Sequence, residues 1–269
     1  MIKPETRPHI KGYLEGFIQG IINEHKTSNL NPKELRPTKD FSKEGDIKPF
    51  HEALIPDGIL RISEFERTFS TKLGTTFEEV AKLIGKDNYA QAERGYKISG
   101  VVSTNAVRTI ESIIDKMGGG MNRSYLDLIS QVVDASKGTG ETRWRIADLY
   151  MSDKKGNEIF FEIKSPKPNK GQCLEATDRL LQIYAMRQAG PPKVRTYYAM
   201  AYNPYGINKN DYTHSFTCRY MDLKNQVLIG KEFWNLIGGN GTYEEVLEIY
   251  REVGREKGHD MIDQLALDY

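Results

Sequence analysis

The sequence predicts an α/β fold in which the strands of a central sheet are flanked by helices. Two observations support this prediction. Residues 143–172 contain two apolar runs joined by the turn-forming residues DKKGN, which is typical of a β-hairpin. Helical periodicity precedes this hairpin, and a further helix and an apolar strand follow it. The order helix, hairpin, helix, strand suits a sheet covered by helices.

The N-terminal third is predicted to be mainly helix and loop. Residues 12–24 place apolar side chains on one helical stripe. Residues 26–60 are rich in Pro, Asn, Lys and Ser and are typical of a surface loop. The pair Thr75-Thr76, with glutamates three positions later, predicts a capping box that opens a helix ending at about residue 85.

The rest of the chain is predicted to alternate helices with strands. Helices are expected at residues 104–117, 122–135 and 172–189, and a last long helix from Thr242, whereas residues 193–202 form a strand. No repeat or low-complexity linker divides the sequence. We therefore expect a single domain over residues 1–269, with a core at about 60–220, an N-terminal helical and loop region at 1–60 and a C-terminal helical region at 225–269.

Composition limits the class of protein. A chain of 269 residues with 38% hydrophobic residues can bury one substantial core. It has no apolar run long enough for a transmembrane helix and no apolar signal core near residue 1, so we expect neither membrane insertion nor secretion. Cys173 and Cys218 are too few for a disulfide framework or a zinc site, which favours the reducing cytosol. A net charge of +1 argues against coating nucleic acid by bulk charge but allows local basic patches.

The predicted hairpin carries charged residues at the ends of its apolar runs. Strand side chains alternate between faces, so Glu162 and Lys164 project together, and Ile146, Asp148 and Tyr150 are expected to share one face of the other strand. The hairpin can then bring Asp148 beside Glu162 and Lys164. Two carboxylates and an ammonium can hold Mg²⁺, position a water molecule and offset charge on a phosphate. This is the chemistry of metal-dependent phosphodiester hydrolysis.

The alternative for this hairpin is a solvated turn whose charges face water. Glu-x-Lys occurs by chance in a chain with 28% charged residues, and an upstream Asp is then easy to find. The context favours catalysis, because Glu162 and Lys164 end the strongly apolar run IFFEIK and precede the stiff, basic segment SPKPNKG. Charges at the mouth of a buried strand need a reason, since burying them without a partner is costly.

Asp148 followed by Glu162-x-Lys164 resembles the signature of the PD-(D/E)XK nucleases, with Ala147 at the position of the nominal proline. The surroundings are similar to type II restriction endonucleases, and more narrowly to TdeIII-type enzymes. The similar segments, within residues 60–220, are FSTKLGTTFEEVAKLIG at 69–85, EIKSPKPNKGQ at 162–172 and AYNPYG at 201–206.

The resemblance implies a restriction-endonuclease-like core, a central mixed sheet whose second and third core strands carry the acidic residues. It also implies extra helices at both ends of the chain. The implied activity is sequence-specific, Mg²⁺-dependent cleavage of double-stranded DNA by a homodimer in the cytoplasm of a prokaryote, at a GGNCC-like site. A cognate DNA methyltransferase, not physically bound, is expected to be encoded nearby. In this interpretation Asp148 and Glu162 hold the metal, and Lys164 orients or deprotonates the attacking water.

Two further residues have competing interpretations. In similar endonucleases an N-terminal helix supplies another carboxylate to the metal, and Glu78 matches that placement; it can equally cap its own helix. Gln172 lies beyond the loop after Lys164, where it can hold a water or phosphate, or simply begin the next helix.

DNA contacts are predicted from basic and polar residues near the hairpin. Arg143, Arg145, Lys167 and Lys170 can reach phosphates, although the two arginines can also be a solvated strand edge. Residues 203–220 are the predicted recognition region, unless they form a surface loop with aromatic packing. Its candidate base-contacting side chains are Asn203, Tyr205, Asn208, Lys209 and Arg219.

Two rival functions remain open. The first is a repair or junction nuclease of the same fold, and the second is a non-catalytic DNA-binding protein that keeps the fold. The complete set of Asp148, Glu162 and Lys164 argues against the second. A nucleotide-driven motor is excluded because the glycine run at 118–120 lacks the Lys-Ser/Thr that completes a phosphate-binding loop.

Overall fold

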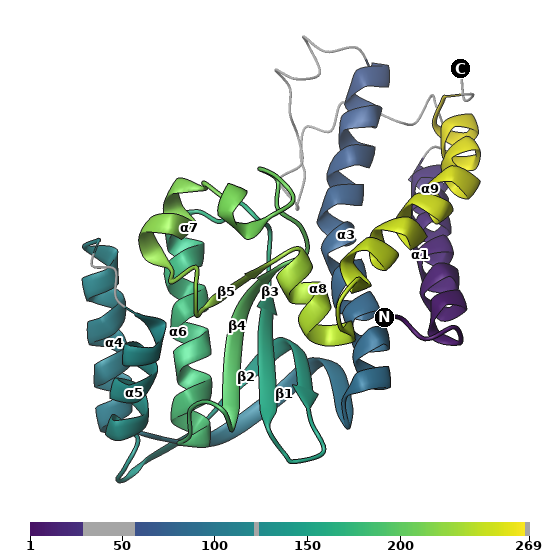
Figure 1. Cartoon of the computed structure of the whole chain (residues 1–269). Coiled ribbons are helices and arrows are strands. Elements are labelled where there is room, and N and C mark those ends of the chain that lie inside the picture. Colours follow the sequence, from purple (N-terminus) through teal and green to yellow (C-terminus); the bar gives the residue numbers. More distant parts are fainter. Residues whose placement is uncertain (29–56, 121–123, 267–269) are drawn as a thin grey trace. The chain divides into compact units, whose positions relative to one another are not determined.

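A computed structural model describes residues 1–28, 57–120 and 124–266 (Figure 1). Its contacts divide the chain into two compact units, one of Met1–Thr6 with Phe77–Val246 and the other of Arg7–Thr76 with Leu247–Tyr269. The first unit contains the sheet and the predicted hairpin. The expectation of a single endonuclease domain stays a prediction.

The first unit is built on a five-stranded mixed sheet of order β1-β2-β3-β4-β5. The strands are β1 (Gln91–Ser103), β2 (Gly140–Ser152), β3 (Glu158–Ile163), β4 (Val194–Met200) and β5 (Val227–Ile229). β1, β2 and β3 pair antiparallel, whereas β3, β4 and β5 pair parallel. The predicted mixed sheet is therefore confirmed, and its second and third strands carry Asp148 and Glu162.

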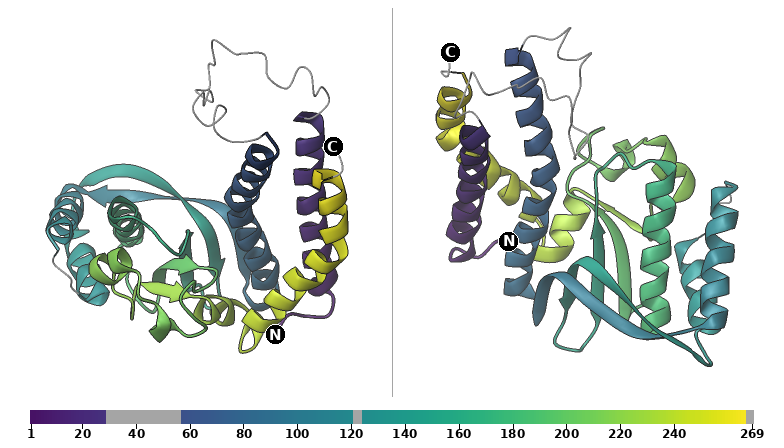
Figure 2. Two further views of the ribbon diagram at one scale, coloured as in Figure 1. Left: turned by 90° about the horizontal axis from the view of Figure 1, so that it is seen from above. Right: turned by 180° about the vertical axis from the view of Figure 1, so that it is seen from behind.

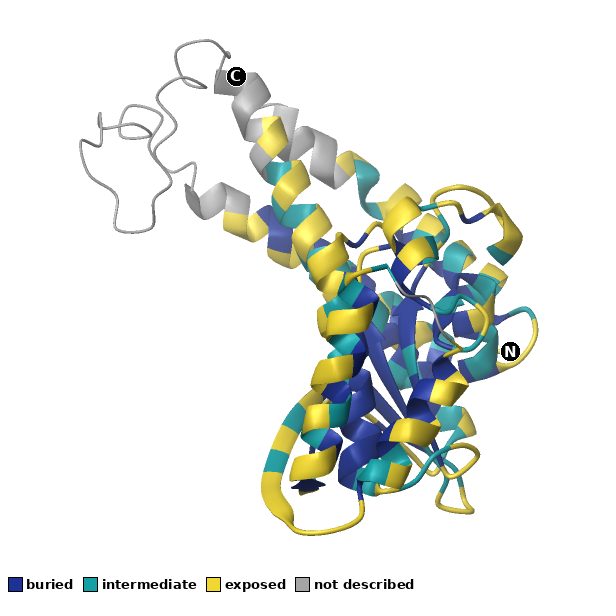
Figure 3. Cartoon of the chain, turned by 90° about the vertical axis from the view of Figure 1, so that its left-hand side faces the viewer, coloured by how far each residue is buried: buried dark blue, intermediate teal, exposed yellow. Residues whose placement is uncertain are grey.

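Helices cover both faces of this sheet (Figure 2). One face packs against α4 (Thr104–Gly118), α5 (Tyr125–Ala135), α6 (Lys170–Arg187) and α7 (Ser215–Tyr220), which share one hydrophobic cluster with the strands. On the other face, Phe233 of α8 (Lys231–Gly238) packs edge-on against Phe161 of β3. The central strands are buried on both sides (Figure 3), which explains why their sequences are apolar runs.

The second unit is helical in its described residues. It contains α1 (Thr6–Ser28) from Arg7 onward, the first part of α3 (Asp57–Asn88) and most of α9 (Thr242–Ala266). Arg7 and Lys11 of α1 both pair with Glu252 of α9, at 2.7 and 2.8 Å. The predicted helix at 12–24 and the predicted start of a helix at Thr242 are confirmed. The predicted loop at 26–60 is wrong at residues 26–28 and 57–60, which belong to α1 and α3, and the rest of it lies outside the described residues.

The predicted capping box at Thr75-Thr76 is wrong, because α3 runs without a break from Asp57 to Asn88. The hydroxyls of Thr75 and Thr76 donate back to the carbonyls of Lys72 and Leu73, both at 2.7 Å, instead of accepting from the next turn. Threonine makes such backward hydrogen bonds inside helices. Glu78 is therefore not a helix-capping residue.

Other predicted elements agree with the structure. α4, α5, α6 and β4 match the expected helices and strand to within a few residues. The sequence interpretation missed β1, α7 and β5. The helix α8 lies inside the region expected to be helical at 225–269, whereas β5 is a strand inside it. Both cysteines are free thiols. Within the described residues, no helix has the length and apolar character needed to cross a bilayer.

Candidate active site

The candidate site forms where the pairing of β2 with β3 ends. The last paired residues are Leu149 and Phe161, and Asp148 is the next residue of β2. Because the strands separate here, the Asp148 carboxylate can accept a hydrogen bond from the main-chain N–H of Ile163, with 2.8 Å between Oδ2 and N. The end of the hairpin ladder thus fixes the position of one acidic side chain.

β2 departs from strict alternation beside Asp148. Ala147 and Tyr150 both belong to the hydrophobic cluster under α6, although regular alternation would put them on opposite faces. Ile146 is 51% exposed and Tyr150 only 4%. The prediction that Ile146, Asp148 and Tyr150 share one face is therefore wrong. Gly95, the β1 residue level with Asp148, takes a φ of +58°, which glycine tolerates, and this irregularity was not visible in the sequence pattern.

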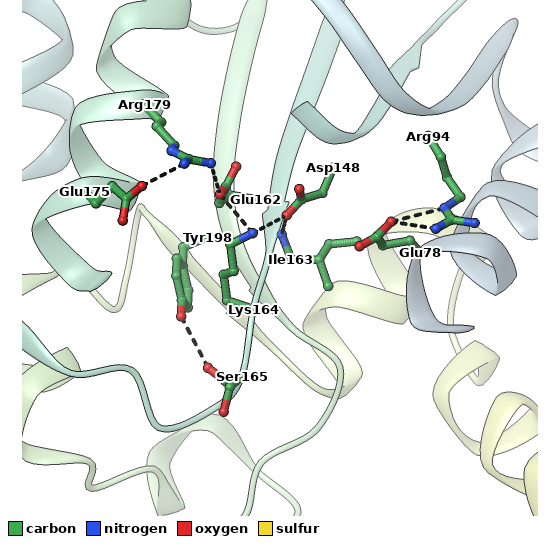
Figure 4. A network of polar contacts seen from close by, with 10 residues as sticks. All are labelled: Glu78, Arg94, Asp148, Glu162, Ile163, Lys164, Ser165, Glu175, Arg179 and Tyr198. Atoms are coloured by element: carbon green, nitrogen blue, oxygen red, sulfur yellow. Dashed lines mark hydrogen bonds and ion pairs between the residues drawn. The ribbon is translucent and has the colours of Figure 1, made fainter. Parts of the chain in front are cut away.

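Lys164 joins the two acidic residues of the predicted motif (Figure 4). Its Nζ lies 2.9 Å from Asp148 Oδ2 and 3.0 Å from Glu162 Oε1. The structure therefore brings together the three residues predicted to be catalytic. Their spacing in the sequence places one on β2, one on β3 and one directly after β3.

Burial shapes the charges of this cluster. Glu162 is 3% exposed, and burial raises the pKa of its carboxyl, followed by repulsion from Asp148; Lys164 and Arg179 act in the opposite direction. Burial alone would lower the pKa of Lys164, but Asp148 and Glu162 outweigh it and raise that pKa. Lys164 is accordingly a cation in this arrangement, suited to orienting a water and offsetting negative charge.

The donor set fits Mg²⁺. All hydrogen bonds and ion pairs to these carboxylates from the described residues reach Asp148 Oδ2 and Glu162 Oε1, which leaves one oxygen of each carboxylate for a cation. Magnesium is commonly bound by one or two carboxylates, with water and phosphate oxygens completing its shell. Within the described residues no three His, Cys, Asp or Glu side chains gather closely enough to share an ion. The set is therefore a pair of carboxylates.

Glu78 lies near this pair but is held by Arg94 of β1. Its Oε2 accepts from Arg94 Nε at 3.1 Å and from Nη2 at 2.9 Å (Figure 4). Burial raises the pKa of Glu78, Arg94 opposes this, and the charge of Asp148 adds to the rise. The charge of Asp148 thus acts on Glu78. Both hydrogen bonds from Arg94 reach Oε2 of Glu78, and the role of Glu78 as a metal ligand through its other oxygen stays a prediction.

The loop after β3 holds the next predicted residues. Lys167 is exposed and its Nζ lies 5.4 Å from the ring centre of Tyr205, whereas Lys170 donates to the Gly118 carbonyl at 2.7 Å. Gln172 forms a reciprocal capping box with Asn169 at the start of α6. Its side chain thus has the helix-starting role that was the alternative to phosphate binding.

The predicted recognition region, residues 203–220, packs on this loop through Tyr212, whose hydroxyl donates to the Pro166 carbonyl at 2.6 Å. Several of its predicted DNA-contacting side chains make contacts within the protein. Asn203 Nδ2 donates to the Asn208 carbonyl at 2.7 Å, and Lys209 binds Glu232 and the Val227 carbonyl. Asn203 thus links two parts of the region, Lys209 attaches the region to β5 and α8, and the DNA contacts of both stay predictions.

More of the predicted DNA-contacting side chains are open to solvent. Tyr205, Asn208 and Arg219 are exposed, although the guanidinium of Arg219 lies 5.5 Å from the ring centre of Tyr220. Arg143 and Arg145 on β2 are half-buried and lower the pKa of Asp178 on α6, against the larger effect of burial. Their charges therefore reach Asp178, and their contacts with DNA phosphates stay predictions.

Sequence reasoning missed two arginines of the site. Arg179 of α6 pairs with Glu162, with 3.1 Å between Nη1 and Oε1, and Arg94 pairs with Glu78. Arg94 lies on a strand that was not predicted. The only signal for Arg179 was its spacing of four residues from Glu175, which is common on helix surfaces.

Comparisons with known proteins agree with this geometry. Residues 6–254 match the family model described as "Type II restriction endonuclease, HinfI". The type II restriction enzymes HgiCII and HgiEI of Herpetosiphon aurantiacus are each 43% identical to this chain over 98% of it, and the matches cover 99% and 98% of those enzymes. The type II restriction enzyme MjaII of Methanocaldococcus jannaschii is 24% identical over 76% of this chain and 58% of its own length. The predicted resemblance to type II restriction endonucleases is thereby confirmed.

Proposed function

Since the chain belongs to the HinfI family of type II restriction endonucleases, we propose that it cleaves double-stranded DNA at a specific site with Asp148, Glu162 and Lys164 as its catalytic residues. The observation that carries this assignment is the single ammonium of Lys164 lying within hydrogen-bond distance of both carboxylates. A protein that only bound DNA would have no need to collect two acids and a lysine at the mouth of a buried strand.

The proposed reaction is hydrolysis of a phosphodiester. A water oxygen attacks phosphorus, one P–O bond to a sugar breaks, and the products are a phosphate and a hydroxyl end. Asp148 and Glu162 would hold Mg²⁺, which neutralises phosphate charge and lowers the pKa of bound water. Lys164 orients the attacking water and offsets the negative charge that develops in the transition state. Glu78 is a candidate for an additional ligand through Oε1, the oxygen that Arg94 does not bind.

The remaining features of the proposal rest on the resemblance. Cutting both strands of a short symmetric site usually takes two active sites, which favours a homodimer. The narrower likeness to TdeIII-type enzymes favours a GGNCC-like site and a cognate methyltransferase encoded nearby. Two free thiols suit the reducing cytoplasm of a prokaryote.

Digestion of unmethylated phage and plasmid DNA tests the proposal. Wild type and Lys164→Ala are compared with Mg²⁺ and with EDTA, and a second substrate set carries GGNCC with each of the four central base pairs. We expect discrete fragments that need Mg²⁺ and disappear in the variant, with ends that map to the site. A metal-dependent smear would favour a repair or junction nuclease. DNA binding without any cleavage would point to a non-catalytic protein.

A further inference from the structure

Among the described residues, Glu162 is the only charged residue that is buried. An ionised carboxylate in this position is stable only if it is paired. Two cations form ion pairs with Glu162, and both bind the same oxygen. Lys164 Nζ lies 3.0 Å and Arg179 Nη1 lies 3.1 Å from Oε1. Lys164 also serves Asp148, so Arg179 is the partner that Glu162 does not share with the other acid.

Arg179 is itself held in place. Its Nη2 lies 2.7 Å from Oε1 of Glu175, one turn earlier on α6, while Nη1 reaches across to β3 (Figure 4). The adjacent residue Leu180 is buried in the hydrophobic cluster, which fixes the backbone under the arginine. The planar guanidinium is thus fixed at two points and presents one N–H group to Glu162.

A second arginine on α6 repeats this arrangement at the far end of β3. Arg187 Nε lies 2.7 Å from Oε2 of Glu158. Eight helical residues between the arginines span ~12 Å at 1.5 Å each, and four strand residues between the glutamates span ~13 Å at 3.3 Å each. The matching spans mean that two Arg–Glu ion pairs hold α6 beside β3, through one hydrogen bond at Glu162 and through two at Glu158. Only one of them includes a residue of the active site.

We propose, on the basis of the proposed nuclease function, that Arg179 is a positioning residue of the cleavage site. It orients the Glu162 carboxylate from α6, so that Oε1 is turned toward the protein's own cations and the other oxygen is presented for a divalent metal ion. Arg187, with the same partner type on the same two elements, serves only the attachment of α6 to the sheet. Arg179 therefore acts through Glu162 and does not itself contact the reacting atoms.

The test compares Arg179→Ala, Arg179→Lys and the matched control Arg187→Ala. Three quantities are measured for each full-length protein: thermal unfolding, Mn²⁺ binding by calorimetry without DNA, and the single-turnover cleavage rate at saturating DNA. Loss of a side chain that orients a metal ligand typically weakens metal affinity or activity by about 10- to 100-fold. We expect this loss in Arg179→Ala with unchanged DNA affinity, partial recovery in Arg179→Lys, and cleavage within about threefold of wild type in Arg187→Ala.

Several results would overturn the inference. Tighter Mn²⁺ binding in Arg179→Ala would mean that Arg179 competes with the metal and does not position its ligand. Equal losses in Arg179→Ala and Arg187→Ala would reduce Arg179 to a helix anchor. Because Mn²⁺ binding is measured without DNA, a weaker Mn²⁺ affinity in Arg179→Ala supports the positioning role even if wild type cuts no substrate, in which case only the proposed nuclease function fails. A wild type that binds no Mn²⁺ would contradict both.

Discussion

Replacing Lys164 by Met should abolish most cleavage while leaving the fold intact. Methionine keeps the length of the side chain but removes the ammonium that lies 2.9 Å from Asp148 and 3.0 Å from Glu162. Groups that orient or protonate reactants contribute typically 10²- to 10⁴-fold to a rate. We expect a loss of about 10³-fold in the single-turnover rate, which is ~4 kcal/mol of transition-state stabilisation at 1.36 kcal/mol per tenfold.

The effect on stability should be much smaller. After the substitution Asp148 keeps the N–H of Ile163 and Glu162 keeps Arg179, so neither carboxylate loses every partner. The lysine side chain is 43% exposed, which limits what its ion pairs contribute to folding. We therefore expect the melting temperature to change by only a few degrees.

The assay is single-turnover cleavage of a labelled duplex with excess enzyme and Mg²⁺, beside DNA affinity measured with Ca²⁺ in place of Mg²⁺. The matched control is Lys154→Met, which removes one exposed positive charge from the turn of the same hairpin. The assignment of Lys164 fails if its variant cleaves within tenfold of wild type. It fails equally if Lys154→Met loses as much activity, because the loss would then reflect net charge alone.

Three further substitutions test the electrostatics and the surface. Glu162→Gln should inactivate the enzyme yet raise the free energy of unfolding at pH 7 by about 0.5–2 kcal/mol, because functional residues are often kept at a cost to stability. Burial raises the pKa of Glu162, so the ionised carboxylate lowers stability above about pH 4.5. The stability gained by the substitution should therefore shrink in acid. Asp222→Asn should cost about 1 kcal/mol at pH 7. Hydrogen bonds, led by Asn225, outweigh burial and lower the pKa of Asp222, so this difference should be fully present above about pH 3.8 and shrink as the pH falls below it. Urea unfolding across pH measures both effects. Trp144→Ala should change the free energy of unfolding by less than about 1 kcal/mol, because Trp144 is 54% exposed and loses mainly its contact with Lys97; a larger loss in the same urea titration would contradict its exposed placement.

The hairpin and its chemistry were predictable because their signals are local. The turn at Asp153 is built from its own side chain, whose Oδ1 accepts from the N–H groups of Lys155 and Asn157 at 2.8 and 2.9 Å. The apolar run of β3 and the charges at its end are contiguous in the sequence. Pairing of β2 with β3 then places Asp148 opposite Glu162, so no other element of the fold is needed to predict that these two residues meet.

The rest depended on tertiary contacts that a sequence pattern does not contain. β1 was missed because Glu93, Arg94, Gly95 and Lys97 interrupt its apolar alternation, and its partner β2 lies about 50 residues further along the chain. The break in alternation near Asp148 and the pairing of Arg179 with Glu162 likewise arise only when separate elements pack together.

The two ion pairs between α6 and β3 also restrict how this helix can move. A slip of α6 by one helical turn, ~5.4 Å along the strand, would carry Arg179 away from Glu162 and Arg187 away from Glu158 at the same time. A shift in register by one residue, in which each residue takes the place of the next, would turn both arginines by ~100° around the helix axis. After either shift of α6, neither of the two ion pairs can form again. Only one register of α6 on the sheet keeps both ion pairs, and this register also fixes the distance from α6 to the carboxylates of the site.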